Sequence, residues 1–293
     1  MFLLVTDTHL GLYKSNDVWH NVAISLFKEI ADTALRRGID TLIHLGDFFN
    51  ERKATNTKTI SVAYEIENIL KDFKQVYIIT GNHDIYYKDR LSPSSLEIFK
   101  NSKNIKVISE PYPLDEGILL VPWGQEIPTD TGAEYCFGHF DITGCYMNNS
   151  KICDKGMYSS EDFKQFKQVY SGHFHTPSNN GNITYLGSPY QQTFHDVGST
   201  RGYYVFSSNK GDLEFIPFEN YPKFTILRTS DIIEEDKVKG NIVKLVFDED
   251  YGTNKNIELV EKVQAMNPMT FNTDFTKVAG KDDMMEEDEI DES

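Results

Sequence analysis

The sequence predicts an α/β protein in which two packed mixed β-sheets are flanked by helices, followed by a small α+β domain. Two observations support this prediction. Strand-like and helix-like segments alternate over roughly the first hundred of 293 residues, which is typical of a parallel sheet covered by helices. Short strand-like segments then dominate up to residue 218, which favours a second sheet packed on the first.

The first part of the chain carries clear local signals. Three segments rich in apolar and β-branched residues are expected to form buried strands: residues 2–6, 40–45 and 75–80. Apolar residues at helical spacing predict two long helices, one from Val18 and ending before Gly38, and one from about Thr57 to Phe73. Ser92-Pro93 is expected to open a short helix, with Ser92 as its cap.

The pattern changes from about Lys106. Seven short strand-like segments follow, and we expect them in the second sheet: residues 105–108, 117–123, 134–140, 168–174, 182–187, 202–208 and 213–218. Beyond them, two more strand-like segments (223–228 and 241–248) and a helical one (256–266) predict a small α+β cap domain. The expected domains are therefore residues 1–218, 219–280 and an acidic tail at 281–293.

Composition narrows the function. The net charge is −16, and the last thirteen residues, with eight acids and one lysine, predict a disordered tail. The rest of the chain also has a negative net charge, which argues against a protein that coats DNA through a broad basic surface. Three cysteines without a CxxC pair favour free thiols in a cytoplasm, and no apolar run is long enough for a membrane span or a signal peptide.

Polar clusters follow several of the predicted strands directly. They are "TDTH", "GDFF", "GNHD", "FGHF" and "SGHFH", and they contain Asp7, His9, Asp47, Asn82, His83, Asp84, His139, His173 and His175. Ligands of open α/β sheets bind beyond the carboxyl ends of strands, so these side chains are expected to line one pocket. The i, i+2 spacing of Asp7 with His9, and of His173 with His175, places each pair on one face of an extended chain.

Imidazole, carboxylate and amide groups without a thiolate favour divalent ions such as Mn²⁺, Fe²⁺ or Zn²⁺. Seven candidates are too many for one tetrahedral site and suit two ions: Asp7, His9, Asp47, Asn82, His139, His173 and His175. Two divalent ions would leave the site cationic enough for a phosphodiester. His44 lies within a strand and is expected to be a core histidine, whereas His20 is expected on a helix surface.

The motif order D-x-H, GD-x-F, GNHD, GH and GH-x-H resembles that of the calcineurin-like metallophosphoesterases, over roughly residues 1–190. "GDFFNERKATNTKT", "GNHDIYYK", "SGHFHT" and "YLGSPYQQTF" resemble the SbcD-type DNA nuclease branch, particularly its counterparts in large tailed phages. The resemblance implies one ion held by Asp7, His9, Asp47 and His175, and another held by Asp47, Asn82, His139 and His173. It also implies that His83 faces the substrate and that Asp84 orients His83.

Mn²⁺ is the expected metal, with Mg²⁺ or Fe²⁺ as alternatives, and the cytoplasm is the expected location. The same resemblance implies a homodimer that forms through the early helices. It implies a DNA substrate and a coiled-coil ATPase partner of the SbcC type. Basic residues after two of the motifs are candidates for phosphate contacts: Arg52, Lys53, Lys58, Lys88 and Arg90. The helix at 254–266 carries Ile257, Val260 and Val263 on one stripe, which either docks the ATPase or covers the small domain's own sheet.

Two rival functions remain open. A phosphomonoesterase or protein phosphatase of this superfamily resembles GD-x-V-D-R-G, whereas here Glu51 takes the arginine position and Arg52 comes one place late. A metal-free interaction scaffold with this fold would be expected to lack ligands, and none is missing from the motifs. Asn50 replaces a second histidine that is frequent three residues after the bridging aspartate in the cellular nuclease branch.

Overall fold

The computed structural model describes residues 1–114, 117–148, 151–249 and 251–275, and the predicted tail at 281–293 lies outside them. The chain divides into two compact units. The first contains Met1–Tyr190 and Thr200–Tyr221, and the second contains Gln191–Ser199 and the chain from Pro222 onward. Among the described helices, none combines the length and the apolar character that a membrane span requires.

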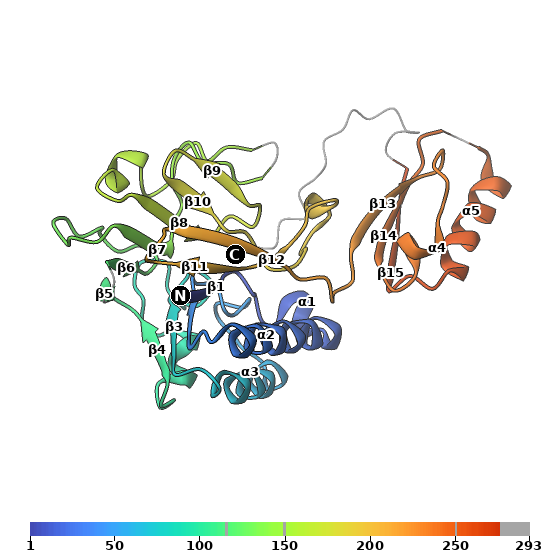
Figure 1. Cartoon of the computed structure of the whole chain (residues 1–293). Helices are drawn as coiled ribbons and strands as arrows, with labels where there is room; N and C mark the ends of the chain where they lie inside the picture. Colours follow the sequence, from blue (N-terminus) through green and yellow to red (C-terminus); the bar gives the residue numbers. More distant parts are fainter. Residues whose placement is uncertain (115–116, 149–150, 250, 276–293) are drawn as a thin grey trace. The chain divides into compact units, whose positions relative to one another are not determined.

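The first unit contains two six-stranded sheets (Figure 1). The strands of the first sheet are, in spatial order, β12 (Asp212–Pro217), β11 (Gly202–Ser207), β1 (Phe2–Val5), β2 (Thr41–His44), β3 (Gln75–Ile79) and β4 (Ile105–Ile108). Those of the second are β5 (Tyr112–Leu114), β6 (Ile118–Val121), β7 (Tyr135–His139), β8 (Gln168–Gly172), β10 (Ile183–Tyr185) and β9 (Ser178–Asn180). The predicted fold class, two mixed sheets flanked by helices, is confirmed.

Three strands do not lie in the sheet that the sequence predicted. The strands β4, β11 and β12 were expected in the second sheet and belong to the first, where β4 runs parallel to β3 and β11 runs antiparallel to β1. Local pattern identifies a strand but not its neighbours. The position of β11 in the first sheet buries Phe206. Its ring packs between the sheets against Tyr135, Phe137 and Tyr170, with ring centroids 5.0–5.4 Å apart.

Two long helices lie side by side against the first sheet, α2 (Asp17–Arg37) and α3 (Thr57–Leu70) (Figure 1). Asn16 caps α2 by accepting from the Val18 amide at 2.9 Å, and Gly38 ends it in the left-handed conformation. His20 was expected on the helix surface, but it is buried between the two helices and pairs with Thr59 Oγ1 at 3.1 Å.

Short elements complete the first unit. The segment α1 (Leu12–Ser15) is a left-handed turn, since Tyr13 and Lys14 both have positive φ. The 3₁₀ helices are η1 (Ser95–Phe99) and η2 (Ser160–Phe163), together with η3 (Phe194–Asp196) in the second unit. Ser94, rather than the predicted Ser92, caps η1 by accepting from the Leu96 amide at 3.2 Å.

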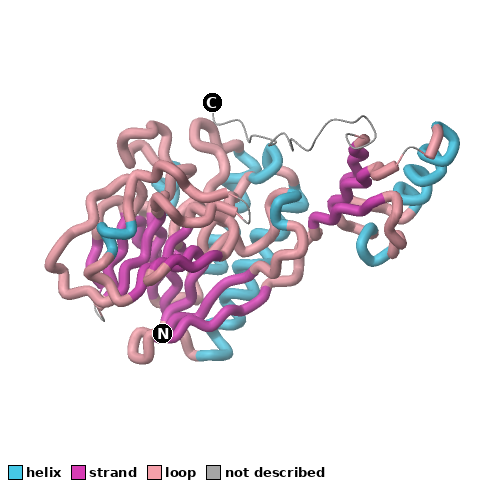
Figure 2. Tube along the Cα trace, turned by 90° about the horizontal axis from the view of Figure 1, so that it is seen from above, coloured by secondary structure: helices cyan, strands magenta, loops and turns pink. Residues whose placement is uncertain are grey.

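The register of the parallel strands determines where the polar clusters lie. Val5 pairs with His44, and His44 pairs with Ile78, so β1, β2 and β3 end level with one another. In the second sheet, His139 pairs with Gly172, so β7 and β8 end level too. Figure 2 shows all strands of the chain in magenta. Residues that follow the five strands therefore emerge at a common edge of the sandwich.

The second unit is a small three-stranded parallel sheet with helices packed on it. Its strands are β13 (Phe224–Arg228), β14 (Ile242–Val246) and β15 (Thr270–Asp274), and its helices are α4 (Glu235–Val238) and α5 (Thr253–Ala265). The sequence did not predict β15, whose residues "TFNTD" are mostly polar and largely exposed. The excursion Gln191–Ser199 joins this unit through Phe194, whose ring lies 5.1 Å from that of Phe224.

The apolar stripe of α5 covers this sheet. Val263 is fully buried in a cluster with Leu227, Val243 and Leu245, and Val260 packs against the same cluster. Ile257 is half-exposed. Of the two roles predicted for the stripe, covering the unit's own sheet therefore accounts for Val263 and for the packed part of Val260.

Replacing Val263 with aspartate is expected to unfold the second unit. The change places a carboxylate without a partner in an apolar cluster, and we expect it to lower the free energy of unfolding by more than about 3 kcal/mol. Urea unfolding followed by circular dichroism measures this effect. Ile257→Asp on the exposed side of the same helix is the matched control, with a change within about 0.5 kcal/mol. Equal effects of the two substitutions would contradict this packing.

Candidate metal centre at the strand ends

All seven predicted ligands come together at the common edge of the two sheets. Asp7 and His9 follow β1, Asp47 follows β2, and Asn82 follows β3. His139 ends β7, while His173 and His175 follow β8. Three groups of side chains each have their potential ligand atoms within 4.8 Å of one another: Asp7, His9 and His175; His9, Asp47 and His83; and Asp47, His139 and His173.

The backbone at these strand ends is strained. Asp7, His9, Asp47 and His173 have φ values of 52°, 42°, 54° and 88°, in the left-handed region that side chains with a Cβ seldom adopt. Hydrogen bonds between the loops hold this conformation: the Asp7 amide donates to the Gly46 carbonyl at 3.0 Å, and the His9 amide donates to the Asp47 carbonyl at 3.1 Å. The turns aim the side chains inward, toward one another.

The first group is built around two facing imidazoles. His9 Nε2 and His175 Nε2 lie 3.0 Å apart. Asp7 Oδ1 lies 3.9 Å from His9 Nε2 and 3.8 Å from His175 Nε2. Asp47 Oδ2 approaches His9 Nε2 to 3.7 Å, so the Asp47 carboxylate borders this group as well. We call Asp7, His9 and His175 the first cluster.

Asp47 also belongs to the group that contains His139 and His173. Asn82 Oδ1 lies 3.0 Å from both His139 Nε2 and His173 Nδ1. Asp47 Oδ2 lies 3.3 Å from His139 Nε2. We call Asn82, His139 and His173 the second cluster. Asp47 stands between the two clusters, in reach of a histidine from each.

The donor atoms fit cations. His139 Nδ1 faces the Leu45 carbonyl at 2.8 Å, and because a carbonyl only accepts, this nitrogen carries the hydrogen. His139 Nε2 faces Asn82 Oδ1 at 3.0 Å and Asp47 Oδ2 at 3.3 Å, which are acceptors too. His9 Nδ1 has no hydrogen-bond partner among the described residues. Imidazole nitrogens that converge with carboxylate and amide oxygens suit a divalent ion.

Electrostatics favour the same interpretation. Burial lowers the pKa values of His9 and His173 well below their usual range, so both rings are neutral and able to coordinate. Burial also disfavours the charged form of His139, but the Asp47 carboxylate outweighs it and raises the pKa of His139 to about 9. In the metal-free protein a proton on His139 therefore compensates Asp47, and a divalent cation would take over that role.

Two glycines allow the loops to approach this closely. A Cβ on Gly81 would overlap the carboxylate and the amide of Asp47, and a Cβ on Gly172 would overlap Thr6 Oγ1 and crowd the Asp7 carboxylate. The glycines that precede the ligands at positions 82 and 173 are therefore required for space rather than for φ.

His83 lies beside the first cluster, with its ring centroid 4.8 Å from that of His9. The prediction that Asp84 orients His83 is wrong. His83 Nδ1 donates to the Asn50 carbonyl at 2.8 Å, whereas the Asp84 carboxylate accepts from the amides of Phe49 and Gly81 at 3.0 and 2.9 Å. Asp84 thus fastens two ligand-bearing loops together. Burial raises its pKa to about 7.

The predicted phosphate-binding residues have different surroundings. Arg52 Nε donates to the Asn82 carbonyl at 2.8 Å, so this side chain supports a cluster residue. Lys58 pairs with Asp17 at 2.7 Å, and the Arg90 guanidinium lies 3.9 Å from the Tyr87 ring centroid. Lys53 and Lys88 are exposed.

Sequence reasoning missed two contributors to this centre. One is the Asn50 carbonyl that orients His83, a main-chain role that residue type cannot reveal. The other is Trp123, whose ring lies 4.8 Å from His173 and 5.8 Å from His139. The signal for Trp123 was its place two residues after the end of β6, near the level at which the candidate ligands of neighbouring strands emerge. The expectation for His44 is confirmed, since it is buried and pairs with Thr8 Oγ1 at 2.9 Å.

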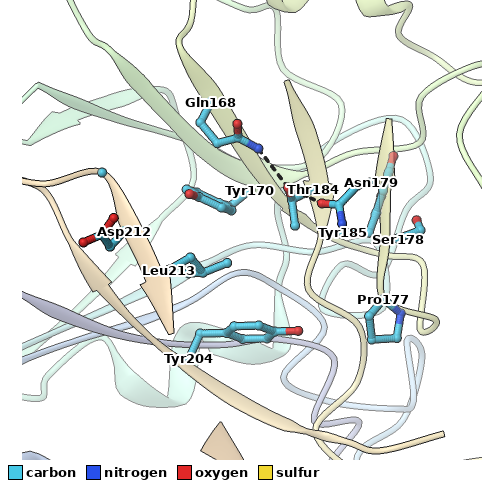
Figure 3. Close-up of a pocket in the computed structure, with 11 residues that line it drawn as sticks. Gln168, Tyr170, Pro177, Ser178, Asn179, Thr184, Tyr185, Tyr204, Asp212 and Leu213 are labelled. Atoms are coloured by element: carbon cyan, nitrogen blue, oxygen red, sulfur yellow. Dashed lines mark hydrogen bonds between the residues drawn. The ribbon is translucent and has the colours of Figure 1, made fainter. Parts of the chain in front are cut away.

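A separate cleft of about 470 Å³ lies in the same unit, where the edges of the two sheets face each other (Figure 3). Its lining includes Gln168, Asn179, Thr184 and Tyr204. Gln168 donates to Thr184 Oγ1 at 2.8 Å, and Thr184 donates to Asn179 Oδ1 at 2.7 Å, so these polar groups are used in joining strands. The chemistry of the metal centre has no counterpart in this lining.

The sequence is similar to those of known proteins. Exonuclease subunit 1 of Enterobacteria phage T4 is 36% identical over 229 residues, which cover 72% of this chain and 66% of that protein. The DNA double-strand break repair protein Mre11 of Sulfurisphaera tokodaii is 30% identical over 127 residues, 41% of this chain and 33% of that protein. The chain thus spans two thirds or less of the length of these relatives.

Among solved structures, the Pseudomonas putida nuclease MPE aligns with a TM-score of 0.33 and 22% identity, over 62% of this chain and 66% of that chain. The family model of the calcineurin-like phosphoesterases matches residues 1–177, the part of the chain that carries all seven predicted ligands. This protein belongs to the calcineurin-like phosphoesterase family.

Proposed function

We propose that this protein is a two-metal phosphodiesterase that cleaves DNA, as the nuclease subunit of an SbcCD-like complex for DNA end processing and recombination. The observation that carries the proposal is the position of Asp47 between the two clusters, where its carboxylate approaches a histidine of each. Membership of the phosphoesterase family supports the reaction class, and the names of the phage and archaeal relatives support DNA as the substrate.

In this proposal, Asp7, His9 and His175 hold one ion, and Asn82, His139 and His173 hold the other, with Asp47 between them. Mn²⁺ is the proposed metal, and Mg²⁺ and Fe²⁺ are the alternatives. Divalent ions in such a centre polarise the phosphoryl oxygens and lower the pKa of water. The protein's part is to fix the positions of the ligands before the substrate arrives, and the strained turns and fastened loops serve this purpose.

His83 is the proposed group that acts on the substrate. Its Nδ1 is committed to the Asn50 carbonyl, which fixes the orientation of the ring and leaves Nε2 for the reacting phosphate. A histidine placed in this way can stabilise the developing charge or give a proton to the leaving oxygen. Asp84 contributes by holding the loop on which His83 stands.

Contacts with the DNA backbone are assigned to Lys53 and Lys88, two exposed lysines that follow the Asp47 and Asn82 motifs in the sequence. Lys58 and Arg90 have partners that a phosphate would have to displace, and Arg52 supports Asn82. Two free lysines and a net charge of −16 fall short of the several phosphate contacts that duplex binding needs. A coiled-coil ATPase partner and a second copy of this chain are the proposed sources of further contacts.

The decisive experiment is a digestion of end-labelled duplex and single-stranded DNA with Mn²⁺ or Mg²⁺. Controls are a chelator, a phosphomonoester and a simple phosphodiester. We expect metal-dependent cleavage of DNA and of the diester, with the monoester left intact. Hydrolysis of the monoester alone would favour the phosphatase alternative, and a purified protein that binds no metal would favour the scaffold.

Asp47→Asn is expected to remove at least one ion and to abolish DNA cleavage. An amide cannot balance two cations as a carboxylate does, although its size is the same. Metal content per chain and the cleavage rate are measured together. Asp40→Asn, an exposed aspartate in the same unit, is the matched control and should change neither. A fully active Asp47→Asn protein with normal metal content would refute the two-metal centre.

His83→Ala is expected to slow DNA cleavage about 10²- to 10⁴-fold while both ions stay bound. The reason is that this histidine is assigned to the substrate rather than to metal. Single-turnover rates and metal content test the assignment. His195→Ala, at an exposed histidine in the second unit, serves as the control. Loss of an ion from His83→Ala would place His83 among the ligands instead.

A further inference from the structure

Among the described residues, Arg201 has the largest side chain that is fully buried, with 1% of its surface exposed. It lies directly before β11, at the point where the chain returns to the first unit from the excursion Gln191–Ser199. Burying a guanidinium is costly unless its donors are satisfied, so its contacts indicate what it does.

The Arg201 guanidinium holds the backbone of a cluster residue. Its Nη1 donates to the carbonyl oxygen of His175 and to Ser188 Oγ, the latter at 3.2 Å. The Ser188 amide donates to the same His175 carbonyl at 3.0 Å. Two donors therefore fix the backbone of His175 from behind, while its imidazole faces His9.

Tyr190 extends this arrangement to the other half of the first cluster. The Ser188 hydroxyl donates to the Tyr190 carbonyl at 2.9 Å. The Tyr190 side chain is buried, and its hydroxyl donates to the carbonyl of Thr8, the residue between Asp7 and His9. One connected network thus fastens both strand ends that supply the first cluster.

The second cluster is held by other contacts. His139 is oriented by the Leu45 carbonyl, and the Asn82 backbone is held by Arg52. We propose that Arg201, Ser188 and Tyr190 are positioning residues that set the affinity of the first cluster for its metal ion, independently of the second. This inference rests on the proposed two-metal function.

The test is a titration of the metal-free protein with Mn²⁺, followed by the paramagnetic resonance signal of the free ion. For Arg201→Met, which keeps the length of the side chain but removes its donors, we expect one ion to bind about 10- to 100-fold more weakly. The other ion should keep its affinity. Arg37→Met is the matched control, because Arg37 makes an exposed ion pair with Glu214 in the same unit and should leave both affinities unchanged.

Tyr190→Phe is the milder variant, and it decides the outcome if Arg201→Met does not fold. It removes a single hydroxyl, and we expect the same ion to bind about 3- to 10-fold more weakly. Unchanged affinity for both ions, or equal weakening of both, in a folded variant overturns the proposal. The unmodified protein distinguishes a failure of this proposal from a failure of the proposed function. If the unmodified protein binds fewer than two ions, the two-metal function itself is refuted.

Discussion

Polar side chains from five strand ends converge onto one small volume, and the rest of the first unit serves to hold them there. Carboxylates, imidazoles and an amide are buried together, and the Asp7 and Asp47 carboxylates repel each other. They stay because β1, β2 and β3 end level, and because the apolar layer around Phe137 and Phe206 fixes one sheet against the other. Strain at Asp7 and Asp47 is sustained by that packing.

The convergence of the candidate ligands could be predicted from the sequence, because it depends on the type of each side chain and on its place after a strand. Asp7, His9, Asp47 and the remaining candidates could be identified without knowing the pairing of the strands. The long helices could be predicted for a similar reason, since their apolar spacing and the stop at Gly38 are local signals. All of this information lies within short stretches of chain.

What could not be predicted depends on long-range contacts. The place of β11 in the first sheet follows from where Phe206 finds aromatic partners, and nothing in "GYYVFS" distinguishes the two sheets. Asp84 was misassigned because a carboxylate beside a histidine suggested a side-chain pair, whereas amides from Phe49 and Gly81 occupy it. His20 was placed on the surface because Thr59, the partner of its Nε2, lies on another helix.

The excursion Gln191–Ser199 limits how the second unit could be deleted or exchanged. The chain crosses between the two units after Tyr190, after Ser199 and after Tyr221, so three junctions join them. Deleting everything beyond Tyr221 would leave Gln191 without the Phe224 amide that it binds, and Phe194 without the ring on which it packs. The second unit is therefore not a module that evolution or an engineer can exchange at one splice site. An exchange that preserves the first unit must carry the nine-residue excursion along with the sheet that receives it.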